Sequence, residues 1–147
     1  MFEDAELLYR RAIEITEATL GKDHPDYSIR LNNLAELLGA EGKYEDAEPL
    51  FRLAMEVTEA TLGKTHPYYF TRLEGLAGLL QKQGKYEDAK LLYRHAIEIT
   101  EETLEKDNPS YSKRLSNLAG LLQAKVRAWV CDCALNENAN RNLVLRL

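Results

Sequence analysis

The chain has 147 residues, with 24 acidic and 19 basic side chains and a formal net charge of −5. At 45% hydrophobic and 29% charged, it has the length and composition of one globular domain, not of a disordered chain. No apolar run approaches the roughly 20 residues of a membrane helix, and the mild acidity argues against a nucleic-acid partner.

The chain repeats itself at a spacing of 42 residues. Residues 2–43 and 44–85 share 26 identical positions of 42, and residues 44–85 and 86–127 share 23 of 42. The segment Phe2-Glu3-Asp4-Ala5, for example, corresponds to Tyr44-Glu45-Asp46-Ala47. Self-similarity at such a period predicts a solenoid in which each unit is one supersecondary element.

The first helix of the first unit is expected at about residues 3–20. The acids Glu3 and Asp4 suit the positive end of the helix dipole, and Gly21 is a plausible C-terminal stop. Its apolar residues follow helical spacing: Ala5, Leu8, Ala12, Ile13, Ile15 and Leu20. Arg10 is expected to pair with an acid one helical turn away, such as Glu6.

The second helix is expected to start near Pro25, which is preorganised for a first helical position, and to stop at Gly42-Lys43. His24 before it predicts a capping or packing role in the loop. The apolar stripe of this helix has the spacing i, i+3, i+4, i+7: Leu31, Leu34, Ala35 and Leu38. Neither helix can bury its stripe alone, so neighbouring units must stack.

The third unit keeps a helix start at Asn108-Pro109. It has Glu105 in place of the stop glycine. It also lacks the later turn, because Val126-Arg127 replaces the Gly42-Lys43 of the first unit. The last helix is therefore expected to run on to about Ala134, with the polar residues 136–142 breaking the pattern. Alternatively, the tail folds back as an irregular cap over the last repeat. Trp129 is expected to pack the chain end.

The block Leu31-x-x-Leu34-Ala35-x-x-Leu38, followed by Gly42-Lys43-Tyr44-Glu45-Asp46-Ala47, Phe51 and Ala54, resembles the tetratricopeptide repeat. The 42-residue unit with its Leu-Gly-Lys-x-His-Pro connection is similar to kinesin-light-chain-type repeats. This resemblance implies an all-α fold, an α-solenoid of helix-turn-helix repeats that forms a right-handed superhelix of about six to seven helices.

In that family each repeat is a helix A followed by a helix B, and this chain starts with a helix B. The expected organisation is therefore three units in B-A order over residues 1–127 (2–43, 44–85 and 86–127), followed by a divergent extension or cap at 128–147. Such an arrangement is that of a piece of a longer array, or of a short array with an open end.

The family resemblance also implies a peptide-binding groove along the A helices, where the three copies differ most. Asn amides can bind a peptide backbone as donor and acceptor, and glycines can leave room for a partner side chain. An alternative for these glycines is close packing between helices, and an alternative for the whole stripe is a solvated face. The candidate groove residues are Ile29, Asn32, Asn33, Glu36, Thr71, Glu74, Gly75, Gly78, Lys82, Lys113, Ser116, Asn117 and Gly120.

The sequence gives little support for phosphate binding, metal binding or catalysis. Thr58 to Thr65 resembles a phosphate-binding loop only in part, because its leading glycine is missing and a helix precedes it. Cys131 and Cys133 lack the further ligands of a zinc site, and their number indicates a reducing compartment. No nucleophile–base pair is visible. We therefore expect no catalysis, no cofactor and no metal.

These observations predict a cytoplasmic scaffold that binds a peptide or protein segment in its groove, with no nucleic-acid or membrane partner. The alternative function is a self-assembly module, in which copies of the chain form a homo-oligomer by stacking through their open terminal helices.

Overall fold

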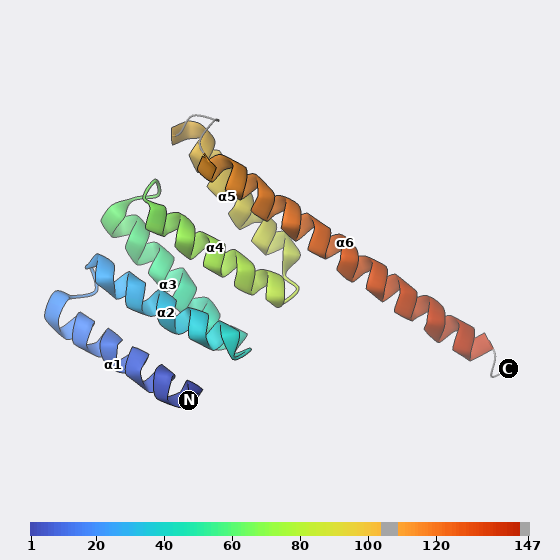
Figure 1. Ribbon diagram of the computed structural model, residues 1–147, viewed down its shortest axis with the longest axis horizontal. Coiled ribbons are helices and arrows are strands. Elements are labelled where there is room, and N and C mark those ends of the chain that lie inside the picture. Colours follow the sequence, from blue (N-terminus) through green and yellow to red (C-terminus); the bar gives the residue numbers. More distant parts are fainter. Residues whose placement is uncertain (104–108, 145–147) are drawn as a thin grey trace.

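The computed structural model describes residues 1–103 and 109–144, with side chains up to residue 133. Over these ranges the protein is all α, and six helices pack against one another in chain order (Figure 1). Glu105, which replaces the stop glycine, and Asn108, at the expected start of the last helix, lie outside the described residues. The helices are α1 (Phe2–Leu20), α2 (Pro25–Ala40), α3 (Tyr44–Leu62), α4 (Pro67–Lys82), α5 (Tyr86–Thr103) and α6 (Pro109–Val144).

The helix starts follow the sequence signals closely. Pro25 and Pro67 are the first residues of α2 and α4. Nδ1 of His24 accepts a hydrogen bond from the Asp26 backbone N–H at 3.2 Å, and Nδ1 of His66 accepts one from the Tyr68 N–H at 3.1 Å. Both histidines thus satisfy an N–H that the first turn of a helix leaves free, which confirms the predicted capping role.

The turns from α2 to α3 and from α4 to α5 depend on glycine. Gly42 and Gly84 have φ of 81° and 76°, a left-handed conformation that strains any residue with a Cβ. After each glycine the chain folds back, and the Lys43 N–H donates to the Leu38 carbonyl at 2.9 Å. Val126 stands at the equivalent place in α6, where the chain remains helical instead of turning.

The core lies where the predicted apolar stripes of successive helices meet. Leu34, Leu38, Leu76 and Leu80 are fully buried, each worth roughly 1.5–3 kcal/mol of hydrophobic stabilisation. Alanines with no exposed surface stand at the helix crossings and allow the close approach of the backbones: Ala35, Ala47, Ala54, Ala77, Ala89 and Ala96.

Helix α6 differs from its expected form, because it continues to Val144 and does not end near Ala134. Its second half extends clear of the other five helices, so no folded-back cap forms within the described residues (Figure 1). Trp129 is 67% exposed, and the expectation that it packs the chain end is wrong. The segment after residue 134 contains neither proline nor glycine, and its asparagines disfavour a helix only weakly.

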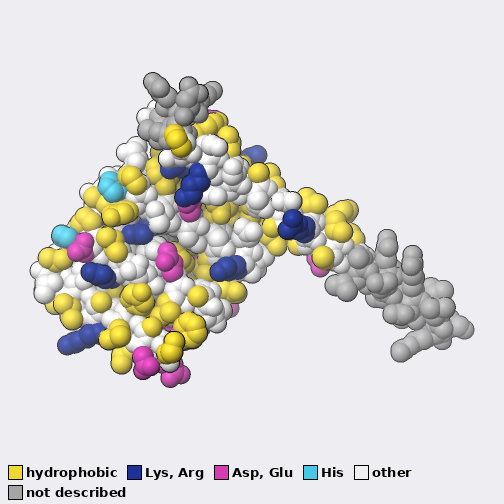
Figure 2. Space-filling view, viewed as in Figure 1, with side chains coloured by type: hydrophobic (Ala, Val, Ile, Leu, Met, Phe, Trp, Pro, Cys, Tyr) yellow, Lys and Arg dark blue, Asp and Glu magenta, His cyan; other side chains and the backbone are white. Residues whose placement is uncertain are grey.

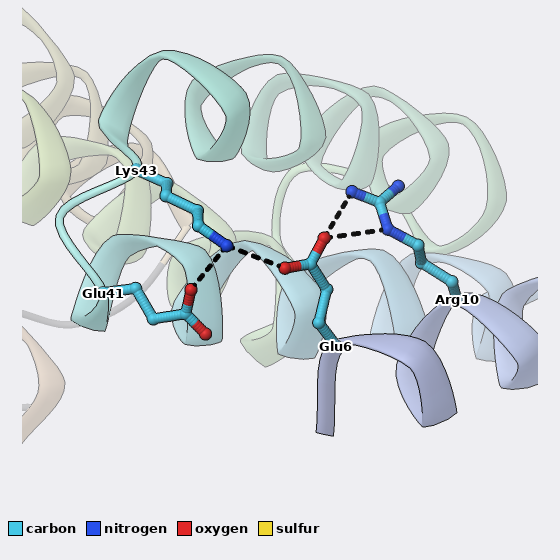
Figure 3. A network of polar contacts seen from close by, with 4 residues as sticks. All are labelled: Glu6, Arg10, Glu41 and Lys43. Carbon is cyan, nitrogen blue, oxygen red and sulfur yellow. Dashed lines mark hydrogen bonds and ion pairs between the residues drawn. The ribbon is translucent and has the colours of Figure 1, made fainter. Parts of the chain in front are cut away.

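An ion-pair network ties consecutive repeats together at their turns (Figure 3). Lys43, at the start of α3, donates to Glu6 Oε2 of α1 at 2.9 Å and lies 2.7 Å from Glu41 Oε2, while Arg10 donates to Glu6 Oε1 at 2.8 and 3.0 Å. Hydrogen bonds from Lys43 and Arg10 lower the pKa of Glu6, and the pKa of Lys43 is raised mainly by its bonds to Glu41 and Glu6. The predicted Arg10–Glu6 pair is therefore part of a larger link between repeats.

None of the described helices combines the length and the apolar character that crossing a membrane requires.

Candidate binding groove

Two hollows lie side by side along the A helices, the face on which sequence variation placed the candidate groove. The α2–α4 hollow encloses about 320 Å³ and the α4–α6 hollow about 410 Å³. Glu74, near the middle of α4, lines both of them. The two hollows together therefore follow three successive A helices.

The structure brings part of the predicted set together. The candidate residues that line one or both hollows are Glu36, Thr71, Glu74, Gly75, Gly78, Lys82 and Lys113. The candidates that line neither of these hollows are Ile29, Asn32, Asn33, Ser116, Asn117 and Gly120. The candidate residues of α4 thus lie together, whereas most candidates on α2 and α6 lie apart from them.

Charged side chains of both signs meet in the α4–α6 hollow. Lys113 Nζ donates to Glu74 Oε2 at 2.9 Å, which links α6 to α4 across the hollow. The guanidinium carbon of Arg114 lies 3.6 Å from the centroid of the Phe70 ring, a cation–π contact. Burial lowers the pKa of Arg114, and Glu74 partly offsets this effect by its negative charge. The buried Nε and Nη1 atoms of Arg114 have no hydrogen-bond partner among the described residues.

The α2–α4 hollow has an aromatic floor. A Cβ added to Gly75 would lie 2.7 Å from Cε1 of Phe51, whereas one added to Gly78 would meet nothing within 4 Å. The expectation that the groove glycines leave room for a partner is therefore wrong for Gly75, because Phe51 of α3 already occupies that space, as the alternative of close packing between helices predicted. Of the two, Gly78 is the one with an open surface.

Asn32 is placed differently from the expectation that its amide contacts a peptide. It is only 2% exposed, and its Nδ2 donates to Glu36 Oε1 at 2.7 Å. Glu36 is exposed and lines the α2–α4 hollow. Asn32 is therefore placed to orient Glu36, while Glu36 presents the charge to the hollow.

Sequence reasoning missed several residues of the hollows. Phe70 and Arg114 line the α4–α6 hollow, and Phe51 and Leu79 line the α2–α4 hollow. Arginine stands at the position of Arg114 in all three copies, so a search for variable positions passes over it. The signal that could have found Arg114 is a charged residue repeated inside an otherwise apolar helix stripe.

Within the part of the chain that the structure describes, no cluster of His, Cys, Asp and Glu is arranged to hold a metal ion. Cys131 and Cys133 are free and exposed on α6.

Comparisons with known proteins agree on one family. The family model of the tetratricopeptide repeat matches twice, over residues 1–60 and 29–102. No curated protein gave a significant match.

Solved structures share the fold at low identity. A point variant of a kinesin-light-chain-like protein of Podosopora anserina, with nearly identical TPR-like repeats, superposes with a TM-score of 0.76 at 23% identity, over 99% of this chain and 69% of that chain. A second structure of the Podosopora anserina protein superposes with a TM-score of 0.76 at 24% identity, over 92% of this chain and 64% of that chain. BtubC (BKLC) from P. vanneervenii superposes with a TM-score of 0.73 at 21% identity, over 96% of this chain and 58% of that chain. The chain thus spans about two thirds of the length of these relatives.

Proposed function

Because the chain belongs to the tetratricopeptide repeat family, whose repeats generally mediate protein–protein interactions, we propose that it binds a peptide or protein segment along its A helices. The observation that carries the proposal is the pair of adjoining hollows that share Glu74. An extended segment that lies across α4 would contact both hollows. It would run over three helices that the repeat architecture holds at fixed spacing.

The chemistry of the two hollows suits a segment of mixed character. The α4–α6 hollow combines Phe70 with the cations Lys113 and Arg114, and the α2–α4 hollow combines Phe51 and Leu79 with Glu36 and Lys82. Apolar floors beside a few placed charges are typical of binding sites, because the floor supplies affinity and the charges fix orientation. Glu74 and Lys113 already pair with each other, so a partner would have to replace that ion pair or lie over it.

The proposal assigns the chain a scaffold role without catalysis. Repeat folds of this type are typically non-catalytic. In the α4–α6 hollow, Lys113 and Glu74 form an ion pair and Arg114 forms a cation–π contact, and neither arrangement activates a nucleophile.

The experiment compares peptide binding to the wild type and to two leucine variants. Gly78→Leu adds a side chain at the open part of the α2–α4 hollow, where nothing lies within 4 Å of an added Cβ. Ala60→Leu adds a leucine at an exposed position of α3, outside both hollows, and serves as the matched control. Peptides are selected from a random displayed library against the wild type, and their affinities are then measured for all three proteins.

We expect the selected peptides to bind the wild type and Ala60→Leu alike and to lose at least tenfold in affinity for Gly78→Leu. Circular dichroism checks that all three proteins have the same helicity. Peptides that bind all three proteins equally would place the binding surface elsewhere and contradict the proposal.

A further inference from the structure

The first helix of the chain leaves one side open. Helix α3 packs between α2 and α4, whereas α1 packs mainly against α2. Leu50 and Val57 of α3 pack against the core cluster that contains Tyr27 and Leu31 of α2. The equivalent residues of α1, which are Leu8 and Ile15, are 70% and 50% exposed.

The last helix leaves the complementary side open. Leu115 and Leu122 of α6 are 43% and 42% exposed, and Ala119 between them is exposed as well. Their equivalents in α2, Leu31 and Leu38, are 3% and 1% exposed because α3 covers them. The same residue types therefore stand at the covered position in α2 and at the open position in α6.

The described part of the chain after residue 126 does not cover this face of α6. The turn glycine of the earlier units is replaced by Val126, and the helix continues straight, away from the other helices (Figure 1). Val126 and Trp129 extend the exposed apolar strip along α6, and Figure 2 shows hydrophobic side chains on this part of the helix. The strip is thus open over its whole described length.

We propose that α1 of a second copy of this chain docks on the open face of α6, in the position that α3 takes on α2. The repeat itself argues for this occupant. Leu8 and Ala12 of α1 are identical to Leu50 and Ala54 of α3, and the strip of α6 is identical to that of α2 at the positions in contact. A second copy therefore offers to α6 apolar side chains at the same positions as those that already bury such a strip inside each molecule, and Leu8 and Ala12 are identical to theirs.

One polar pair fixes the register. At the α2–α3 interface, Thr58 Oγ1 donates to Ser28 Oγ at 2.8 Å in the buried core. The equivalent residues at the open ends are Ser112 of α6 and Thr16 of α1, so the same pair can form between two copies. At the α4–α5 interface the serine is replaced by Phe70. The two open ends therefore match the α2–α3 junction in particular.

This contact joins two different surfaces and is heterologous. Each added copy presents a new open α6, so the assembly grows by head-to-tail addition unless it closes into a ring. The contact uses residues outside the two hollows, so its test is independent of the test of the proposed groove.

The test measures the mass of the 147-residue chain by sedimentation over a wide range of concentrations. Leu8→Glu blocks the α1 face and Leu115→Glu blocks the α6 face, and both leucines are exposed enough to be replaced without unfolding the monomer. Leu7→Glu is the matched control. Leu7 is 69% exposed, beside Leu8 on the same helix, but its equivalents Pro49 and Leu91 are also exposed, so no docked helix would cover it.

The wild type and Leu7→Glu are expected to gain mass with concentration beyond the dimer, or to a closed ring of fixed mass, and each single-face variant to remain monomeric. An equimolar mixture of Leu8→Glu and Leu115→Glu should form a dimer and nothing larger, because only one intact pair of faces remains. A wild type that is monomeric throughout overturns the proposal. So does a Leu8→Glu variant that still self-associates, since this result would indicate pairing of α6 with α6.

Discussion

At the scale of single residues, the two glycines of the α2–α4 hollow have opposite roles. Gly75 allows Phe51 of α3 to pack against α4, so this glycine belongs to the core as much as to the hollow. Gly78 lies one helical turn away and faces open space. A helical glycine of this second kind costs about 1 kcal/mol relative to alanine and gains nothing from packing.

We therefore expect Gly78→Ala to raise the free energy of unfolding by up to about 1 kcal/mol. Gly75→Ala should lower it by about 1–2 kcal/mol, because overpacking against buried Phe51 exceeds the gain in helix propensity. Urea unfolding followed by circular dichroism measures both. Equal stabilisation by the two substitutions would show that Phe51 moves aside without cost.

The ion pairs between repeats predict how stability responds to acid. Hydrogen bonds from Arg52 and Lys85 lower the pKa of Glu48, as those from Lys43 and Arg10 lower that of Glu6. A lowered folded pKa contributes stability that is present above the unfolded pKa of about 4.3 and is lost as the pH falls through the folded pKa.

Thermal midpoints measured from neutral pH down to about one unit below the ordinary glutamate pKa should therefore fall less steeply for Glu48→Gln than for the wild type. Glu45→Gln is the control, because it removes an exposed acid from the same helical turn and leaves the Arg52 and Lys85 contacts in place. Parallel curves for Glu48→Gln and the wild type would contradict the role of this carboxylate.

At the scale of helices, the sequence predicts a helix boundary where a proline or a left-handed glycine imposes it. Prolines at 25 and 67 and left-handed glycines at 42 and 84 set helix boundaries that the structure reproduces. Helix α6 ends at Val144 and not near the expected Ala134, because its asparagines are poor helix formers but no backbone constraint stops the helix there. Weak propensities predict a boundary less reliably than steric constraints do.

The second half of α6 should therefore unfold separately from the body. Asp132→Pro, in the exposed extension, is expected to reduce the helical signal and to leave the thermal midpoint unchanged. The same replacement inside the packed α4, Thr71→Pro, should abolish cooperative unfolding or lower its midpoint strongly. A midpoint lowered by Asp132→Pro would show that the extension stabilises the repeats.

At the scale of the whole molecule, each helix contacts mainly its neighbours in the chain. The candidate groove follows from this regular stacking, so a comparison of repeat copies could place it on the A helices. Its floor could not be predicted in the same way, because Phe51 reaches the hollow from α3 and Arg114 is identical in all copies. The repeat pattern along the chain does not indicate which side chains of another helix reach the hollow.

Nearest-neighbour stacking also predicts a gradient of local stability. Amides of α3 and α4, which are packed on both sides, should exchange slowest in a dilute, monomeric sample, and those of α1 and of the second half of α6 fastest. Native-state hydrogen exchange resolved by residue measures this order. Uniform protection from α1 to α6 would mean that the repeats unfold as a single cooperative unit.

The ion-pair link between repeats has a consequence for how such a gene can change. Lys43 contacts Glu6 as Lys85 contacts Glu48, at 2.9 Å in both cases, so the two junctions are interchangeable in this respect. Removing residues 44–85 would join Lys43 to Tyr86 and leave the Lys43–Glu6 link as it is. Recombination that removes or duplicates residues 44–85 can therefore shorten or lengthen the protein by a whole unit and keep this ion pair at the new junction.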